Sequence, residues 1–160
     1  MLDAAAQRPA RFTLVAAVHL FLLRDEDRSV LLLRRANTGY EDGRHSVIAG
    51  HLNGDETVHA AAIREAREEA GITLAPADVS LVGVMHRRAV APGDDERIDF
   101  FLLAHSWRGV LVNAEPHKCD ELAWYPLDGL PPTVIPYVRR ALTNYRQGRP
   151  FDSFGWPAES

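Results

Sequence analysis

Three glutamates with helical spacing are the most distinctive chemical feature of the sequence. Glu65, Glu68 and Glu69 lie in the segment 49–72, AGHLNGDETVHAAAIREAREEAGI, which is typical of a loop followed by a short helix. Side chains at i, i+3 and i+4 share one face of a helix, so the three carboxylates would meet within one turn. Like charges at that spacing destabilise a helix by roughly 0.2–0.5 kcal/mol per pair, which predicts a positive group among them.

That positive group is either a pair of arginines or a bound cation. In the first case Arg64 and Arg67 would balance the glutamates on a solvated helix. The residues before the helix favour the second case, because a glycine-containing loop at 50–55 leads directly into it. Free N–H groups at a helix start attract phosphate, and carboxylates suit a hard divalent cation. The combination predicts a site for a metal-bound polyphosphate.

The same residues resemble the signature box of the Nudix hydrolases, in particular of MutT-like nucleotide pyrophosphohydrolases. Gly50, five residues, Glu56, seven residues and the run 64–72, REAREEAGI, fill the fixed positions of that box. Ala49 and Ala66 are mild departures, since the family often has a glycine and a larger aliphatic residue there. The resemblance implies an α/β/α sandwich with a mixed sheet between helices.

The resemblance also implies a reaction, the hydrolysis of a nucleoside diphosphate linked to another moiety. Water would attack phosphorus with Mg²⁺ or Mn²⁺ held by Glu65, Glu68 and Glu69, and the chemistry requires mainly positioning and charge neutralisation. The backbone carbonyl of Ala49 is a further candidate ligand, because Mg²⁺ prefers octahedral oxygen coordination. Glu115 is a candidate from outside the box.

Other box residues have supporting roles by the same resemblance. Glu56 and Arg64 would form an orienting pair across the loop–helix junction. One of the box glutamates, or a late acid such as Glu115 or Glu121, would deprotonate or orient the water. For both late acids the alternative is a solvated loop position. Lys118 falls where family members often have an acid, so the base stays open.

Arginines at predicted strand ends are candidates for phosphate contacts. Arg34 and Arg35 follow one strand, Arg87 and Arg88 follow another, and Gly50 would let the backbone approach the substrate. For each arginine the alternative is a plain surface role.

Aromatic and histidine side chains offer weaker indications. Tyr40 and Trp107 could stack on a base, although aromatics at strand ends more often pack in a core. His45, His51 and His59 surround the box, but they lack the cysteine partners and the paired spacing that zinc sites use. A zinc site is therefore not expected, and the family resemblance implies Mg²⁺ or Mn²⁺ instead.

Composition limits the class of protein. The chain has 160 residues, 46% hydrophobic content and a net charge of −4, which predicts one domain with no basic surface for a nucleic-acid polymer or a membrane. The core is expected at 12–147, with the tail 149–160 packed on it. Cys119 is the only cysteine, which suits a reducing, cytoplasmic location. The apolar run 14–23 is too short to span a bilayer.

The rest of the chain is expected to build a sheet around the glutamate helix. Apolar runs and period-two alternation predict strands at 12–23, 30–34, 46–49, 79–90, 97–107 and 122–126. The first two strands, and the pair after the helix, would form hairpins. The helix should start near 56–57 and end at Ala70, because Gly71 suits the left-handed residue after a helix. A first-turn proline opens a second helix at 136–147.

The preferred function is metal-dependent hydrolysis of the pyrophosphate bond in a nucleoside triphosphate. Alternatives within the family are hydrolysis of ADP-sugars or dinucleoside polyphosphates, isomerisation of isopentenyl diphosphate, and a nucleotide-sensing domain without catalysis. The isomerase would need a cysteine near the pyrophosphate, and Cys119 lies far from the box in sequence. The expected partner is a small nucleotide-type substrate, and the protein is expected to be a monomer or a homodimer.

Overall fold

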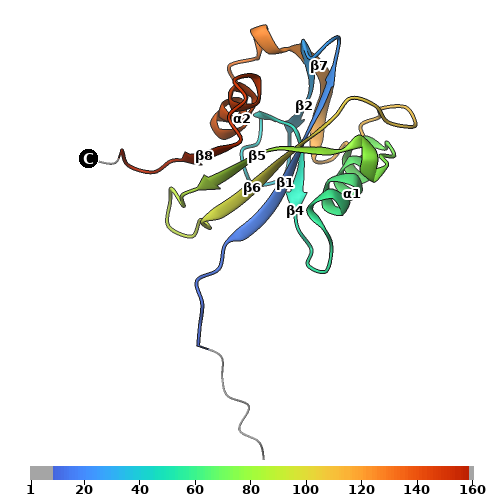
Figure 1. Cartoon of the computed structure of the whole chain (residues 1–160). Helices are drawn as coiled ribbons and strands as arrows, with labels where there is room; N and C mark the ends of the chain where they lie inside the picture. Colours follow the sequence, from blue (N-terminus) through green and yellow to red (C-terminus); the bar gives the residue numbers. More distant parts are fainter. Residues whose placement is uncertain (1–8, 159–160) are drawn as a thin grey trace, which may run out of the picture.

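A mixed sheet of eight strands forms the centre of the protein, and the computed structural model describes residues 9–158 (Figure 1). The strands are β1 (Val15–Arg24), β2 (Ser29–Arg35), β3 (His45–Ser46), β4 (Ile48–His51), β5 (Ser80–Arg87), β6 (Arg97–Ala104), β7 (Cys119–Pro126) and β8 (Phe151–Phe154). The helices are α1 (Val58–Ala70), α2 (Pro136–Arg146) and two short 3₁₀ turns, η1 (Pro76–Asp78) and η2 (Leu127–Gly129).

Strand β1 is the centre of the sheet. The main order is β3-β2-β1-β6-β5-β8, with β4 paired to β1 and β7 paired to β2. The β1–β6 and β5–β8 pairs are parallel and the others are antiparallel. The mixed sheet predicted from the sequence is confirmed.

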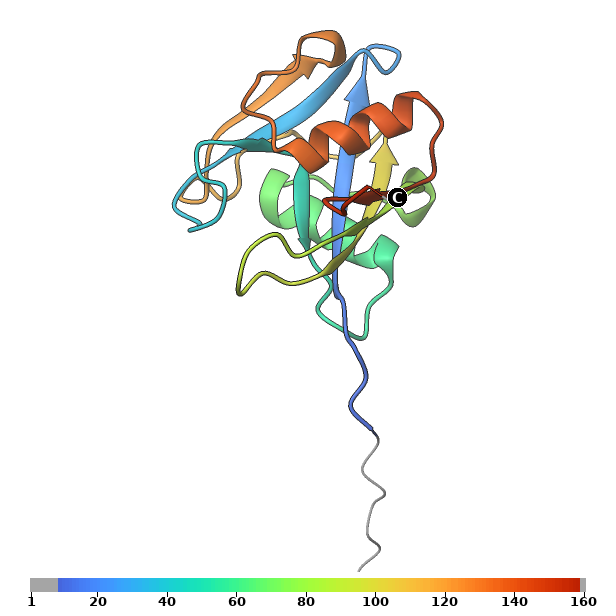
Figure 2. The ribbon, with the colours of Figure 1, turned by 90° about the vertical axis from the view of Figure 1, so that its left-hand side faces the viewer.

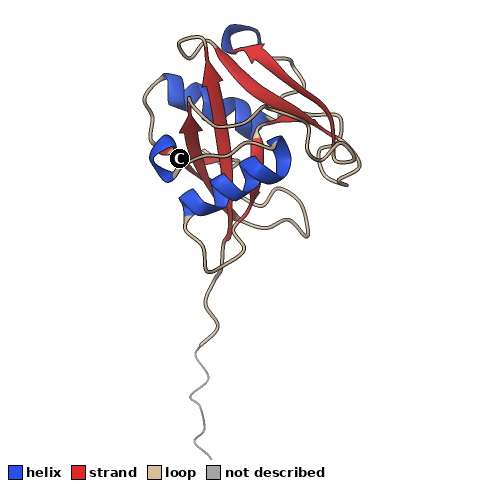
Figure 3. Cartoon of the chain, turned by 90° about the vertical axis from the view of Figure 1, so that its right-hand side faces the viewer, coloured by secondary structure: helices blue, strands red, loops and turns tan. Residues whose placement is uncertain are grey.

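The two helices cover opposite faces of the sheet. Figure 2 views the sheet from the α2 side and Figure 3 from the α1 side. Alternate residues of β1 therefore enter two separate cores: Val18 and Leu20 pack toward α1, whereas Phe21 and Leu23 pack toward α2. This burial on both faces explains why β1 is a nearly continuous apolar run.

Helix α1 has the ends that its sequence predicts. The Thr57 side chain accepts a hydrogen bond from the Ala60 N–H at 3.0 Å, and Gly71 adopts a left-handed conformation with φ of 67°. The buried residues of its inner face include four alanines, Ala61, Ala62, Ala66 and Ala70. Small side chains let α1 lie close to β4, so the glutamates are held near that strand. No helix among residues 9–158 is long and apolar enough to cross a membrane.

Strand pairing differs from expectation in places. The predicted first hairpin is present, but β1 and β2 pair only at Leu23–Val30 and Arg24–Ser29, because farther from the turn β2 pairs with β3 and β1 pairs with β4. The strand expected at 46–49 is two short strands that pair with different neighbours. Strand β7 begins at Cys119 rather than 122, and 151–154 form β8 beside β5. Each difference depends on a distant partner strand.

Candidate functional site

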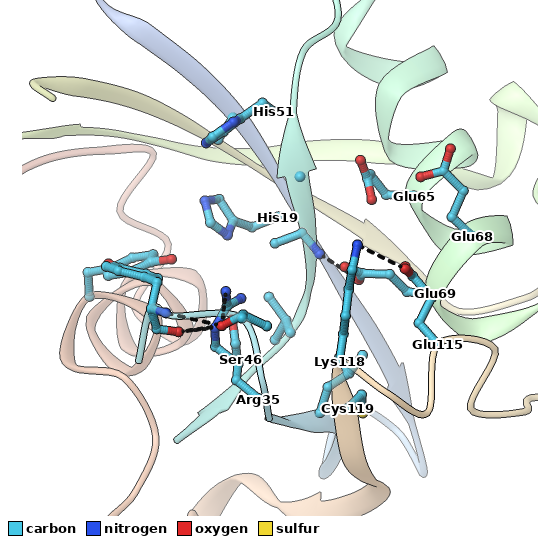
Figure 4. A pocket seen from close by; sticks show the side chains of 18 of the residues that line it. His19, Arg35, Ser46, His51, Glu65, Glu68, Glu69, Glu115, Lys118 and Cys119 are labelled. Carbon is cyan, nitrogen blue, oxygen red and sulfur yellow. Dashed lines mark hydrogen bonds and ion pairs between the residues drawn. The ribbon is translucent and has the colours of Figure 1, made fainter. Parts of the chain in front are cut away.

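A cavity of about 670 Å³ opens between α1, β4 and the face covered by α2. Its walls come from segments far apart in the chain and include Tyr40, Glu69, Arg87, Glu115 and Tyr137. Figure 4 shows an acidic end, where side chains of α1 project, and a second end around His19. The volume is in the range of sites for small organic ligands.

Glu65, Glu68 and Glu69 all line the acidic end. Glu69 is held against β4, because its Oε2 accepts the Ala49 N–H at 3.0 Å. Glu65 approaches the backbone of the next residue so closely that a Cβ on Gly50 would lie 1.9 Å from Glu65 Oε1. The glycine of the box is therefore required by the position of a box carboxylate.

This end is short of positive charge. Burial raises the pKa of Glu69 to about 8, and the neighbouring charges of Glu65 and Glu115 add to that effect, while the Ala49 N–H opposes it. Burial also raises the pKa of Glu65, against the opposing effect of Arg64. Carboxylates that are this reluctant to ionise together are suited to a bound cation.

Arg64 balances part of the charge. Its Nε and Nη2 donate to both carboxylate oxygens of Glu56 at 3.1 and 2.9 Å, and its Nη1 donates to Glu65 at 2.7 Å and to Glu68 at 3.4 Å. Arg64 also donates to the His51 carbonyl at 3.0 Å. The Glu56–Arg64 contact implied by the resemblance is present, and it fixes the loop before α1 to the helix.

The chemical type of the donor atoms fits Mg²⁺ or Mn²⁺. The side chains that carry them do not point toward one common position. In the described part of the chain, no three His, Cys, Asp or Glu side chains already converge as a metal site. Glu65 and Glu68 point to Arg64, and Glu69 points to the Ala49 N–H. The potential ligands are all oxygens, as hard cations prefer.

Of the two late acids, Glu115 lines the cavity and Glu121 does not. Glu121 instead accepts hydrogen bonds from Tyr125 and from His45 Nε2 at 3.0 Å. Lys118 lies at the acidic end and forms an ion pair with Glu115 at 3.4 Å (Figure 4).

Neighbouring arginines are separated by the alternation of their strand. Arg35 lines the cavity and donates to the Tyr40 carbonyl at 2.8 Å, and Tyr40 also lines it. Arg34 is not part of the lining and pairs with Asp120 at 2.7 Å. Trp107 lies against the α1-side core, where its ring stacks on Trp124 with centroids 6.0 Å apart. Arg88 is also outside the lining.

The histidines near the box have separate partners. His45 Nδ1 is 2.7 Å from the Thr133 hydroxyl, and His51 Nε2 accepts from Arg97 at 2.9 Å. Cys119 lines the cavity, but its thiol is buried and donates to the Glu121 carbonyl at 3.0 Å. Burial raises the pKa of this thiol, so it is a poor nucleophile at neutral pH.

The second end contains His19 and Asp99, for which the sequence predicts no role, beside Arg87. His19 is 3% exposed, and its Nε2 lies 2.9 Å from Oδ1 of the fully buried Asp99. Arg87, a candidate phosphate ligand, donates through Nε to the other oxygen of Asp99, and its guanidinium lies 3.6 Å from the Tyr137 ring centroid. In the sequence, the signal for these two residues is a polar side chain within an apolar strand, His19 in β1 and Asp99 in β6.

Comparison with known proteins agrees with this architecture. A family model described as NUDIX domain matches residues 13–145. A solved structure of a MutT NUDIX hydrolase from Burkholderia pseudomallei has a TM-score of 0.74 at 28% identity, covering 82% of this chain and 98% of that one. No curated protein matches the sequence.

Two further solved structures share the fold at lower identity. A MutT protein from Methanosarcina mazei Go1 has a TM-score of 0.69 at 20% identity and covers 83% of this chain and 93% of its own. A NUDIX hydrolase from Nitrosomonas europaea has a TM-score of 0.68 at 20% identity, with coverage of 87% and 93%.

Proposed function

This chain belongs to the NUDIX family of pyrophosphohydrolases, and we propose that it cleaves a nucleoside triphosphate with the help of Mg²⁺ or Mn²⁺. The family supports the general activity, hydrolysis of a pyrophosphate bond in a nucleotide-linked substrate. The observation that carries the finer proposal is the single cavity that joins the box carboxylates to a second end lined by aromatic and hydrogen-bonding groups.

The acidic end would hold the cation and the phosphates. Glu65, Glu68 and Glu69 would bind the cation, with the Ala49 carbonyl and Glu115 as additional oxygen donors. When bound, the cation would neutralise charge that develops on the phosphate oxygens. Arg64 would keep the helix and its preceding loop in register while the carboxylates turn toward the cation.

Hydrolysis then requires a proton acceptor beside the phosphates. Water adds to phosphorus, the bridging P–O bond breaks, and the water proton passes to a carboxylate at the acidic end. Glu115 supports this part of the proposal as the late acid on the cavity wall, and the box glutamates are the alternatives.

Positive side chains on the cavity wall would bind the remaining phosphate charge. Arg35 and Lys118 line the cavity, and Gly50 lies on the same wall. Arg87 has its charge balanced by buried Asp99, so we assign it to the nucleoside end instead of the phosphates. We leave Arg34 out of the site because Asp120 is its partner.

The wider context is also a proposal. We propose one domain across 1–160 that acts on a small substrate in the cytoplasm. The family match at 13–145, the pairing of β8 with β5, and a single buried cysteine support it.

A panel of substrates tests the function. Nucleoside triphosphates, nucleotide sugars and dinucleoside polyphosphates would be incubated with Mg²⁺, Mn²⁺ or EDTA, and the products identified by ³¹P NMR. We expect cation-dependent cleavage of a triphosphate to a monophosphate and pyrophosphate, or to a diphosphate and phosphate. Turnover that persists in EDTA, or the absence of turnover of every triphosphate, would contradict the proposal.

A further inference from the structure

Three adjacent strands place one polar side chain each in a row beneath α2. Strand β6 lies between β1 and β5, and Asp99 of β6 is paired in register with Ala17 and Met85. Its carboxylate thus lies between His19 of β1 and Arg87 of β5. Asp99 is fully buried, whereas His19 and Arg87 both reach the cavity wall.

Asp99 determines which nitrogen of His19 carries the proton. An ionised carboxylate accepts hydrogen bonds and donates none. Arg87 donates through Nε to one of its oxygens and through Nη2, at 3.4 Å, to the other, and this second oxygen also accepts from His19 Nε2–H at 2.9 Å. In the neutral ring, Nδ1 is then left with a lone pair and no proton.

This Nδ1 atom is buried and has no hydrogen-bond partner among the described residues. A buried polar atom without a partner is costly, and an apolar side chain would fill the position more cheaply. His19 is among the residues that line the cavity, so a ligand bound there would supply the missing donor once the neighbouring wall moves enough to uncover Nδ1.

The surroundings of His19 hold its ring in place. Phe101 stacks on it with centroids 4.9 Å apart, and Tyr137 meets it edge-on at 5.4 Å. The Arg87 guanidinium in turn lies over the Tyr137 ring, 3.6 Å from its centroid. At the same cavity Tyr40 keeps 46% of its surface exposed, which leaves an aromatic ring available for stacking. A planar heteroaromatic ring suits these walls.

We propose that His19 Nδ1 accepts a hydrogen bond from an amino group of the substrate's base, and that Asp99 is the positioning residue that makes Nδ1 an acceptor. This inference rests on the proposed function, because it assigns the phosphates to the acidic end of the same cavity. The site therefore selects bases that present a donor to His19 and disfavours bases without one.

Matched substrates measure this selection directly. Purine riboside 5′-triphosphate has no hydrogen-bond donor on its base, and one amino group at C6 or C2 converts it to ATP or to 2-aminopurine riboside 5′-triphosphate. We expect kcat/KM for one of the amino compounds to exceed that of the parent by about tenfold or more. All substrates are compared in one buffer at the same pH.

Asp99→Asn distinguishes positioning from a general structural role. The amide oxygen would accept from Arg87, so the amide NH₂ would face His19 Nε2 and the ring proton would move to Nδ1. We expect the amino-to-parent ratio of kcat/KM to fall to about one or below, and ¹⁵N NMR of labelled histidine to report the tautomer change. A purely structural role would lower kcat/KM equally for all substrates and leave the ratio unchanged.

A second variant keeps the test decisive if Asp99→Asn does not fold. His19→Phe retains a ring against Phe101 but has no acceptor, and the ratio should again fall to about one. Arg88→Gln is the control, because Arg88 lies outside the cavity lining and the ratio should be unaffected. A wild-type ratio near one, or a ratio retained in His19→Phe, overturns the inference.

A binding measurement tests the His19 site independently of hydrolysis. AMP and purine riboside 5′-monophosphate would be titrated into the wild-type protein by calorimetry. Selective binding of AMP, or of the 2-amino analogue, without turnover of any triphosphate would support the His19 site and contradict hydrolysis. Turnover of both classes at equal efficiency would support hydrolysis and overturn the His19 site. If the protein shows no turnover and no selective binding, both the proposed hydrolysis and the His19 site are overturned.

Discussion

Glu65 Oε1 occupies the space in which a side chain on Gly50 would begin, since a Cβ there would lie 1.9 Å from that oxygen. The glycine and the glutamate are 15 positions apart in the box, and the close packing of α1 against β4 brings them together. The absence of a side chain at position 50 therefore leaves room for a carboxylate of the box.

Gly50→Ala should displace Glu65 from the acidic end. Because the contacting atoms are the far end of a flexible side chain, we expect a loss of stability of only about 1 kcal/mol but a fall in kcat/KM of about tenfold or more. Gly83→Ala is the matched control, since the nearest atoms to its Cβ are 3.8 Å away. Equal activity of Gly50→Ala and wild type would contradict this role of the glycine.

Glu69→Gln should stabilise the cation-free protein while removing activity. The folded protein binds the Glu69 proton more tightly than the unfolded chain, so stability should decline as pH rises from about 4.5 toward about 8. Glutamine mimics the protonated form of Glu69. We therefore expect the free energy of unfolding at pH 7 in EDTA, measured by urea denaturation, to increase by roughly 1–3 kcal/mol.

Glu68→Gln provides the comparison for that measurement. The Glu68 side chain is 51% exposed and its partner is Arg64 at 3.4 Å, so its removal should give no comparable gain in stability. Both variants should lose activity by orders of magnitude if both carboxylates bind the cation. Full activity in either one would remove that residue from the ligand set.

Asp99 should contribute to the acid stability of the fold. Burial alone would raise its pKa, but hydrogen bonds and charges from His19 and Arg87 outweigh burial and lower the pKa to about 2. A depressed carboxyl pKa gives stability that is present above about 3.8 and lost as pH falls through about 2. The contribution corresponds to about 2 kcal/mol.

Asp99→Asn should therefore flatten the pH dependence of unfolding in this window. The difference in unfolding free energy between wild type and Asp99→Asn, measured by denaturant titration, should shrink between about pH 4 and pH 2. Asp152→Asn is a useful comparison, because its carboxylate also pairs with an arginine but lies in β8, away from the cavity. A wild-type to Asp99→Asn difference that does not change with pH would contradict the ionised buried pair.

Local signals explain why the acidic end could be predicted from the sequence. The ends of α1 depend on Thr57 and Gly71, which act within one turn of the helix. The three glutamates share a face because of helical spacing alone, and the Glu56–Arg64 contact closes across only eight positions. None of these features requires knowledge of the sheet.

The second end of the cavity, around His19 and Asp99, depends on pairing between distant strands. His19 and Asp99 are 80 positions apart, and they meet only because β1 and β6 are parallel neighbours in one particular register. In the same way, alternation along β2 separates Arg34 from Arg35, but the pairing of β2 with β7 decides which of them faces the cavity.

The central claim is that the box carboxylates hold a divalent cation in the cavity beside the phosphates. A crystal structure with Mn²⁺ and a non-hydrolysable nucleoside triphosphate analogue, with the metal located by anomalous scattering, tests it most directly. We predict an anomalous peak among Glu65, Glu68 and Glu69, within coordination distance of phosphate oxygens. A peak elsewhere, with Glu65 and Glu68 still paired to Arg64, would contradict the claim.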